Sequence, residues 1–410
     1  MLAFALPGHD DATRSMGGAW VGHPSWEVVG AASEVAGRDI AELLLGDDDA
    51  AIDEPVAAHL ATLVGALVGV DAAERLGLAP MAVAGFGAGE LTALVAAGAI
   101  SLDDGVRLAM RRGEAAAATI SLRPCATATV LGLGDDDVEA ACSRAEESVW
   151  VVGQLAPGHV EIAGTTEGVR RAGMIATTLG ARRVLHHVGS SGLHTPLAGS
   201  ARERYRKAIG EATFEVPDPV PFANVDARAH ADPAEWPGLL SAQLCAPIRW
   251  RQGVEAMFES GVRTFLAFGS GAALVGAIRD CLPPRAVQAH TIDSPEDLET
   301  LVDRLIATPS LHRAPMSDHA TLASRLVVAS GTGPFRPAPD VEHALPKLAG
   351  FPSGDDGADV RVEVGDLLGW VGDDEVRSSF CGTLGGLLVI AGERVVQSQP
   401  VAWLQVDEAA

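Results

Sequence analysis

The stretch from Met81 to Ile100, MAVAGFGAGELTALVAAGAI, constrains the fold of this chain more than any other. Its first residues predict a buried β-strand, a glycine-rich turn follows, and the remainder predicts a helix that packs on the strand. The turn has the glycines of a nucleophile elbow, a strained turn that lifts a catalytic side chain out of the edge of a sheet. At the position of that side chain stands Gly87, which has none. The stretch therefore predicts the frame of a catalytic site without its nucleophile.

Length and composition describe a globular protein of two or three domains. The chain has 410 residues, of which 48% are hydrophobic and 20% charged. Its formal net charge of −24 argues against nucleic acid and anionic membranes as partners, because both carry negative charge. The longest apolar run, VAAHLATLVGALVGV, is short for a membrane span and carries His59. We therefore expect no membrane association.

The cysteines and the N-terminus indicate a cytoplasmic protein. The five cysteines are scattered and form no CxxC pair: Cys125, Cys142, Cys245, Cys281 and Cys381. This pattern argues against a disulfide framework and against a zinc site. The N-terminal MLAFALPGHDD has no basic region and predicts a first strand rather than a signal peptide. We expect neither a metal nor a cofactor.

Strand and helix signals divide the chain into an interrupted α/β core, an inserted subdomain, a linker and a β domain. Alternating strands and helices predict a mostly parallel sheet for the core, and LLSAQLCAPIRW predicts one of its helices. The order β-α-β-β-α-β predicts a ferredoxin-like subdomain, and short glycine-punctuated strands predict the all-β domain. The predicted boundaries are 1–119 and 191–308 for the core, 120–190 for the subdomain, 309–324 for the linker and 325–410 for the β domain.

Eight separated pieces of the first three quarters occur in the order typical of one family. The pieces are FALPGHDD, DEPV, GFGAGELTALVAAGAISLDDGVRLAMRRGE, LAPGHVEIAG, SSGLHTPLAG, VPFANVD, QLCAPIRW and FLAFGSGAALVGAI. These eight pieces, and their order, resemble those of the malonyl-CoA:acyl-carrier-protein transacylases and of the acyltransferase domains of polyketide synthases. The resemblance extends over about residues 1–308. The resemblance implies the acyltransferase fold, an α/β-hydrolase-like core with an inserted ferredoxin-like subdomain.

The resemblance also implies roles for individual residues. In the family an elbow serine attacks a malonyl thioester, a histidine accepts its proton, backbone amides hold the oxyanion, and an arginine pairs with the malonyl carboxylate. Here His194 stands at the position of the base. Arg112 stands at the carboxylate-binding position, with Arg111 as an alternative one residue away, and the arginine fork suits a carboxylate. The amides of His9 and Ala88 stand at the oxyanion positions.

Five departures from the family pattern fall in this one pocket. Gly87 replaces the nucleophilic serine, and Phe86 replaces the histidine before it. His9 replaces a glutamine of the oxyanion loop, Glu54 replaces the glutamine of a Gln-Pro step, and Leu155 replaces a polar residue. Covalent catalysis needs a nucleophilic atom near its base, so the usual two-step transfer is not expected. The changes indicate a site released from acyl-enzyme chemistry or converted to another use.

Substitute chemistry by another residue is a second possibility. Ser190 and Ser191 lie near His194 in the sequence, and Ser270 lies in the FGSGAA turn. Loop serines are mostly turn-formers, so none of them is the favoured nucleophile. His9 and Glu54 could form a new acid–base pair, although sequence drift explains them more simply.

The C-terminal quarter resembles the biotinyl/lipoyl carrier domain over about residues 325–405. The resemblance is carried by VVASGTGPFRPAPD, VEVGDLLGWVG and CGTLGGLLVIAGERVVQSQPVAWLQ. In that family a lysine at a hairpin tip takes biotin. Glu375 falls at the lysine position here, and no lysine follows Lys347, which excludes biotinylation and lipoylation of this domain. A small β-sandwich that covers or docks is then the simplest interpretation.

Two functions follow from these patterns. The favoured one is a non-acylating acyltransferase homologue in polyketide or fatty-acid biosynthesis. It would bind acyl groups, acyl-CoA, an acyl carrier protein, or polyketide synthase or carboxylase subunits. The alternative is an active acyltransferase or hydrolase of acyl thioesters that uses His194, or the pair of His9 and Glu54, without an acyl-serine.

Overall fold

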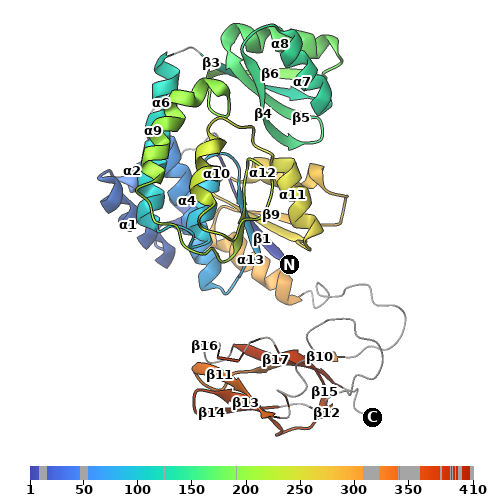
Figure 1. The fold of residues 1–410 in the computed structure, drawn as a ribbon. Helices are drawn as coiled ribbons and strands as arrows, with labels where there is room; N and C mark the ends of the chain where they lie inside the picture. Colours follow the sequence, from blue (N-terminus) through green and yellow to red (C-terminus); the bar gives the residue numbers. More distant parts are fainter. Residues whose placement is uncertain are drawn as a thin grey trace. The chain divides into compact units, whose positions relative to one another are not determined.

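The chain forms two compact units in a computed structural model, residues Met1–Pro309 and Ser310–Ala410 (Figure 1). The structure describes residues 1–8, 16–46, 54–122, 125–190, 192–307, 323–339, 341, 361–378, 381–387, 389, 391–392, 394–395 and 399–406.

A parallel sheet lies at the centre of the first unit, as the sequence predicts. Its five described strands have the order β7-β2-β1-β8-β9, and every neighbouring pair is parallel. The strands are β1 (Leu2–Leu6), β2 (Ala82–Gly85), β7 (Val220–Phe222), β8 (Thr264–Phe268) and β9 (Gln288–Ile292). Because β1 lies in the middle, its carboxyl end lies beside that of β2, with Leu6 opposite Gly85.

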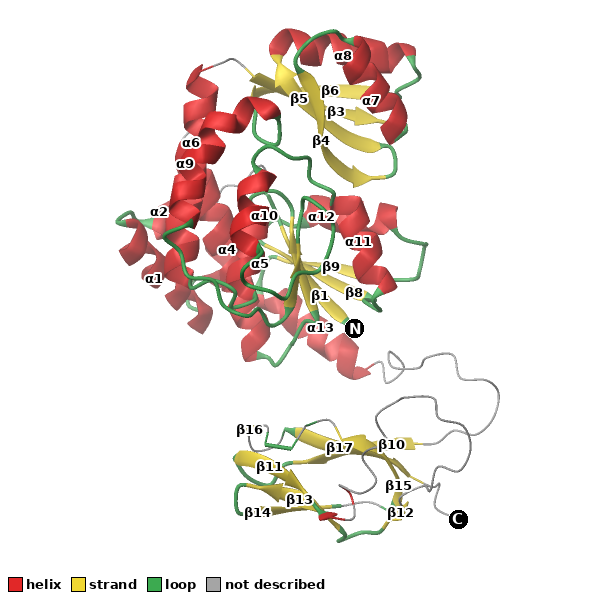
Figure 2. Cartoon of the chain, in the orientation of Figure 1, coloured by secondary structure: helices red, strands yellow, loops and turns green. Residues whose placement is uncertain are grey.

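Helices cover both faces of this sheet, so its strands are almost wholly apolar (Figure 2). Alternate residues of β1 point to opposite faces. Phe4 and Leu6 join the larger apolar core, whereas Ala3 and Ala5 join the smaller one. The helices of the unit's core are α1 (Glu27–Ala36), α2 (Ile40–Leu45), α4 (Pro55–Arg75), α5 (Gly89–Ala96), α6 (Leu102–Leu122), α9 (Gly199–Ile209), α10 (Trp236–Gln243), α11 (Trp250–Glu259), α12 (Ala272–Cys281) and α13 (Pro295–Ala307).

Helix α4 is the central helix of the larger core. It is long and apolar enough to cross a membrane by length and composition, but 89% of its apolar window is buried inside the unit. A helix that is apolar on all sides must be enclosed on all sides, and α4 is packed against α6, α5 and β8. Its apolar sequence is therefore explained by burial in protein.

The inserted subdomain is a four-stranded antiparallel sheet with order β4-β5-β3-β6. Helices α7 and α8 share its apolar core, and the element order is the predicted β-α-β-β-α-β. Its elements are β3 (Cys125–Leu131), α7 (Asp135–Arg144), β4 (Val149–Ala156), β5 (His159–Thr165), α8 (Thr166–Thr178) and β6 (Arg183–Ser190). Two backbone hydrogen bonds join it to the core segment at Ile248, one to Gln154 (3.0 Å) and one to Val152 (2.9 Å).

The second unit consists of two antiparallel sheets of four described strands each. Their orders are β10-β17-β15-β12 and β14-β13-β11-β16, and they enclose one apolar core. The strands are β10 (Ala323–Val328), β11 (Gly333–Pro337), β12 (Arg361–Val362), β13 (Leu367–Val371), β14 (Asp374–Arg377), β15 (Gly382–Leu387), β16 (Arg394–Val395) and β17 (Pro400–Val406).

The hairpin between β13 and β14 corrects one expectation. Val371 pairs with Asp374, so the turn consists of Gly372, with φ of 63°, and Asp373. Glu375 lies in β14 and pairs with Trp370, next to the Val371–Asp374 pair that closes the turn. The equivalence of Glu375 with a lysine at a hairpin tip is therefore wrong in register, because a two-residue turn leaves only Gly372 and Asp373 at the tip.

Candidate functional site

The elbow between β2 and α5 depends on close backbone packing. A Cβ atom at Gly85 would lie 1.9 Å from the carbonyl of Gly89, and one at Gly89 would lie 2.4 Å from the carbonyl oxygen of Leu6. Gly87 between them has φ of 56°, in the left-handed region that favours glycine. The glycines that the sequence singles out thus let the chain reverse tightly at the end of β2. Ala88 is the N-cap of α5, so its amide lies at the positive end of that helix.

Asn224 holds the elbow in place, and Glu90 holds Asn224. The Asn224 Oδ1 atom accepts from the amide of Gly87 (2.9 Å), and its Nδ2 atom donates to the carbonyl of Gly85 (2.6 Å). The Glu90 Oε1 atom accepts from the backbone amide (2.6 Å) and the Nδ2 atom (3.1 Å) of Asn224. The two bonds from the Asn224 side chain to the elbow backbone therefore fix the turn, and the two bonds to Glu90 hold Asn224 in place.

Glu90 is almost wholly buried, and this environment changes its acidity. Burial raises the pKa of Glu90 to about 7, although the hydrogen bonds from Asn224 and the charge of Arg112 act in the opposite direction. Its second oxygen, Oε2, has no hydrogen-bond partner among the described residues. Glu90 therefore serves the structure of the elbow at the cost of a buried carboxyl group.

His194 faces the position where the elbow side chain would begin. Its Nδ1 atom lies 2.8 Å from the carbonyl of Gln243, which can only accept, so Nδ1 carries the proton and Nε2 is an acceptor. A Cβ atom at Gly87 would lie 3.8 Å from Nε2 of His194 and 3.3 Å from Cδ1 of Ile248. The resemblance places a base at His194, and the structure places its Nε2 atom beside the missing nucleophile.

The backbone of His194 is held in an unfavourable conformation. Its φ of 63° lies in the left-handed region, which costs a residue with a side chain about 1–3 kcal/mol. The amide of His194 donates to the carbonyl of Leu244 at 2.7 Å, which holds the loop. Such strain is concentrated at functional sites in proteins.

Of the two candidate arginines, Arg112 lies in the site. Arg112 is 2% exposed, and its guanidinium has Nη1 at 2.9 Å from Nε2 of His59 and Nη2 at 3.5 Å from Nε2 of His194. Arg111 instead points to the surface and forms an ion pair with Glu114 at 2.8 Å. The structure thus brings Arg112, and not its neighbour, beside the base.

Gln243 connects the three parts of the site, and the sequence reasoning missed it. Its Nε2 atom donates to the carbonyl of Gly87 at 2.5 Å, and its Oε1 atom accepts from Arg112 at 2.9 Å. Its backbone carbonyl accepts from His194. Gln243 lies inside the matching piece QLCAPIRW. The helix predicted over LLSAQLCAPIRW is not continuous: α10 ends at Gln243, and α11 begins at Trp250.

Apolar residues also lie beside the elbow. Phe86 lies edge-to-face against Trp250, with ring centroids 6.1 Å apart. Leu155 and Ile248 belong to the same apolar cluster. Phe86 and Ile248 therefore give the elbow apolar neighbours, whereas Arg112 and His194 are polar ones.

Glu54 has a structural position at the start of α4. Its carboxylate is the N-cap, accepting from the amides of Val56 (3.0 Å) and Ala57 (2.9 Å), and it pairs with Arg38 at 2.9 Å. Partial burial acts to raise the pKa of Glu54, but the hydrogen bonds from Arg38 and the two amides outweigh it and lower the pKa. His9, its suggested acid–base partner, lies outside the described residues.

The alternative nucleophiles receive no support from the described geometry. Ser270 is in the left-handed conformation (φ 67°) at a turn, where its amide donates to Asp293 at 3.0 Å. Ser191 and the side chain of Ser190 lie outside the described residues. Among the residues that the structure describes, no three His, Cys, Asp or Glu side chains are grouped so that they could hold a metal ion.

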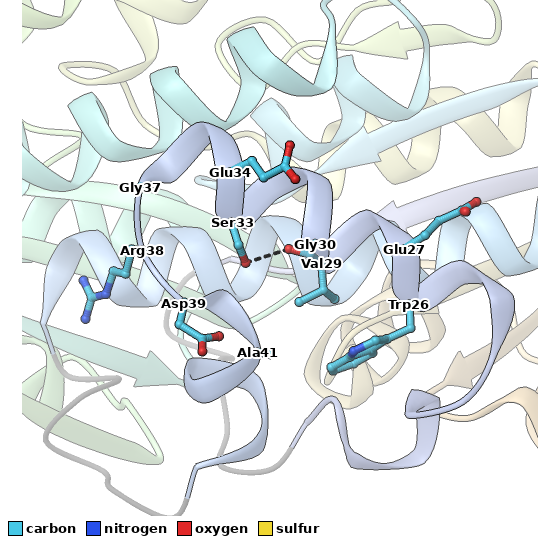
Figure 3. A pocket seen from close by; sticks show the side chains of 10 residues that line it. All are labelled: Trp26, Glu27, Val29, Gly30, Ser33, Glu34, Gly37, Arg38, Asp39 and Ala41. Atoms are coloured by element: carbon cyan, nitrogen blue, oxygen red, sulfur yellow. Dashed lines mark hydrogen bonds between the residues drawn. The ribbon is translucent and has the colours of Figure 1, made fainter.

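A separate surface hollow lies over α1 and the start of α2 (Figure 3). It is lined by Trp26, Glu27, Val29, Gly30, Ser33, Glu34, Gly37, Arg38, Asp39 and Ala41. None of Gly85, Gly87, His194 and Arg112 lines it. The hollow is thus distinct from the elbow site.

These features define a class of protein, an α/β protein with a nucleophile-elbow site that retains a facing histidine and a buried arginine. Comparison with known proteins gives the family. The model of the acyl transferase domain matches residues 31–295. The chain belongs to this acyltransferase family, which includes the malonyl-CoA:acyl-carrier-protein transacylases.

Known relatives and solved structures agree with this assignment. The malonyl CoA-acyl carrier protein transacylase of Bacillus subtilis is 27% identical over 315 residues, which are 74% of this chain and 97% of the relative. The polyketide biosynthesis protein ThaF of Burkholderia thailandensis is 29% identical over 288 residues, 70% of this chain and 24% of the relative.

Two solved structures superpose on the same part of the chain. The acyl carrier protein S-malonyltransferase of Vibrio cholerae has a TM-score of 0.70 and 28% identity, covering 73% of this chain and 99% of its own. A malonyl-transacylase solved in complex with a type II polyketide synthase acyl carrier protein has a TM-score of 0.71 and 26% identity. The match covers 74% of this chain and 99% of that structure's chain. The second unit lies outside the residues matched by the family model.

Proposed function

We propose that this protein binds acyl thioesters, on coenzyme A or on an acyl carrier protein, without forming an acyl-enzyme. The single observation that carries the proposal is the position of Gly87. A side chain at this residue would begin 3.8 Å from Nε2 of His194, and Gly87 supplies no atom there. Without a nucleophile the acyl group has no attachment point on the elbow.

The ordered contacts of the remaining site residues support a ligand-binding function. Arg112 keeps its guanidinium beside His194, and Gln243 holds both of them to the elbow. A buried guanidinium suits the free carboxylate of a dicarboxylic acyl group, because its planar fork offers two parallel donors. We therefore propose Arg112 as the carboxylate contact, His194 as the retained base position, Phe86 as part of the acyl wall, and the amide of Ala88 as an oxyanion donor. The amide of His9 is proposed as the other donor.

The relatives support a role in fatty-acid or polyketide biosynthesis. One is a malonyl CoA-acyl carrier protein transacylase, and another is a polyketide biosynthesis protein. A solved malonyl-transacylase binds a polyketide synthase acyl carrier protein. Accordingly, we propose malonyl-type thioesters as ligands, and an acyl carrier protein or a synthase or carboxylase subunit as the partner.

The second unit supports the proposal of a degenerate biotinyl/lipoyl-like domain. The eight strands form two halves in chain order, β10–β13 and β14–β17. Replacing each strand of the first sheet by its counterpart in the other half, β10 by β14, β17 by β13, β15 by β11 and β12 by β16, gives the order of the second sheet. The unit thus consists of two equivalent interwoven halves, and the β13–β14 hairpin joins them. Because the sequence from residue 348 onward has no lysine, we propose that the unit docks or covers rather than carries a cofactor.

A second candidate function is thioester hydrolysis, which the tautomer of His194 favours. Its Nε2 atom accepts and faces the space above Gly87, so it could take a proton from a water molecule placed there. The water oxygen would bond to the thioester carbonyl carbon, the carbon–sulfur bond would break, and the proton would pass to the departing thiolate. Sites that lose their nucleophile retain about 10³–10⁴-fold rate enhancement from the oxyanion hole and binding.

One experiment separates the two functions. The full chain is incubated with malonyl-CoA, with and without an acyl carrier protein, while intact protein mass and free coenzyme A are followed. Binding by calorimetry with neither adduct nor release supports the binding function. Release of coenzyme A that His194→Ala abolishes supports the hydrolase, and a malonyl adduct on the native chain contradicts both.

A further inference from the structure

His59 stands out as a polar residue inside an apolar helix. It is 3% exposed on α4, whose neighbouring buried residues are almost all apolar. A buried imidazole is costly unless its nitrogen atoms are satisfied. Its contacts therefore indicate what it does.

Those contacts fix the protonation of the ring. The Nδ1 atom lies 2.7 Å from the carbonyl oxygen of Pro55, one turn earlier on the same helix. The carbonyl can only accept, so Nδ1 carries the hydrogen and Nε2 carries the lone pair. That lone pair lies 2.9 Å from Nη1 of Arg112, which can only donate. The imidazole thus accepts from the guanidinium in a single orientation.

Arg112 is consequently held by acceptors on two different elements. His59 accepts from Nη1, and Oε1 of Gln243 on α10 accepts from Nη2 at 2.9 Å. An arginine side chain loses much rotamer freedom when it is ordered, and a ligand that must order it binds more weakly. Here that ordering is completed by the protein before any ligand arrives.

We infer that His59 is a positioning residue that orients Arg112 and so sets the preference of the site for a carboxylated acyl group over a plain one. The inference rests on the proposed function, in which Arg112 contacts the acyl carboxylate. His59 touches the ligand only through the guanidinium. Its loss should therefore weaken binding of malonyl-CoA and leave binding of acetyl-CoA unchanged, because acetyl has no carboxylate.

The test measures the affinities of the full chain for malonyl-CoA and acetyl-CoA by calorimetry. His59→Leu keeps volume but removes the acceptor, and we expect it to reduce the preference for malonyl-CoA about tenfold, the effect of losing one hydrogen bond to a charged group. His59→Gln can place an amide oxygen near the former Nε2 atom and should retain the preference. Thr62→Val, three residues further along α4 and equally buried, is the matched control and should change neither affinity.

Stability and fold are followed in parallel by thermal unfolding. If His59→Leu does not fold, His59→Asn replaces it, because its shorter amide can reach Pro55 but not Arg112. A folded Leu or Asn variant with the native preference overturns the inference while the proposed function stands. If the native chain itself shows no preference for malonyl-CoA, the carboxylate-binding role of Arg112 fails first, and the inference fails with it.

Discussion

The Cβ position at Gly87 lies 3.8 Å from Nε2 of His194. In serine the Oγ atom is bonded directly to Cβ. A hydroxyl at residue 87 that points toward the imidazole would therefore come within hydrogen-bond distance of Nε2. The geometry of a nucleophile and its base is thus present in the backbone, although the nucleophilic atom is not. This relationship makes the missing chemistry of the site directly testable.

We expect Gly87→Ser to introduce acylation by malonyl-CoA, detected as one malonyl group in the intact mass. The double change Gly87→Ser with Phe86→His should increase the rate, since it makes the adjacent wall polar. Because residue 87 has φ of 56°, a side chain there should lower the free energy of unfolding by about 1–2 kcal/mol.

Gly87→Ala is the matched control for this prediction. It imposes the same backbone strain and the same 3.3 Å contact with Ile248, but it has no hydroxyl. We expect an equal loss of stability in urea unfolding and no malonyl adduct. An adduct on the alanine variant would place the acylated atom elsewhere and contradict the assignment of residue 87.

The sequence predicted those parts of the fold that depend on local pattern. The family, the parallel sheet of the core and the antiparallel subdomain are confirmed. Strand β2 is a continuous apolar run ended by glycine, and the elbow glycines are needed where backbones approach closely. Such features are visible because neighbouring residues cause them.

The sequence did not predict the contacts that depend on residues far apart in the chain. Gly87 is fixed by Asn224, 137 positions away, and by Gln243, 156 positions away. Gln243 lay inside a predicted helix that continues to Trp250, but residues before a proline disfavour the helical conformation, and Pro247 accounts for the break. A polar His59 in an apolar helix was the one available signal for the contact with Arg112.

Asn224→Ala should be among the most destabilising single substitutions at this site. It removes the acceptor for the Gly87 amide, the donor for the Gly85 carbonyl and a donor for Glu90, all of them buried. Unsatisfied buried polar groups cost about 1–3 kcal/mol each, so we expect a loss of about 3 kcal/mol in urea unfolding. Thr92→Val, a buried change at a hydroxyl with no partner in the described structure, should be nearly neutral. Equal effects of the two changes would contradict the role of Asn224.

Glu90 should make stability depend on pH in a defined direction. Its pKa is raised from 4.5 to about 7 by burial, so in acid the folded chain holds a proton that the unfolded chain releases earlier. The stabilisation from this shift is fully present below pH 4.5 and is lost as the pH rises through about 7. At about 1.4 kcal/mol per pKa unit, the loss in unfolding free energy is about 3 kcal/mol. Glu90→Gln cannot titrate and should lack this loss.

The measurement for Glu90 is a pair of urea unfolding series, native chain and Glu90→Gln, between pH 5 and 8. Other titrating groups contribute equally to both series, so the difference isolates residue 90. We expect the variant to gain relative stability as pH rises. Parallel curves would show that the buried carboxyl is ionised throughout, and the hydrogen bonds from Asn224 and the charge of Arg112 would then outweigh its burial.

Glu54 should matter for stability and not for ligand binding. Because its carboxylate caps α4, Glu54→Ala should cost about 1 kcal/mol of unfolding free energy. Glu54→Ser replaces one capping side chain with another and should restore most of that loss. Malonyl-CoA affinity and any release of coenzyme A should remain at the native level in both variants. If thioester turnover disappears in Glu54→Ser although its stability is normal, the carboxylate acts in the chemistry, and the pairing of Glu54 with His9 becomes the better hypothesis.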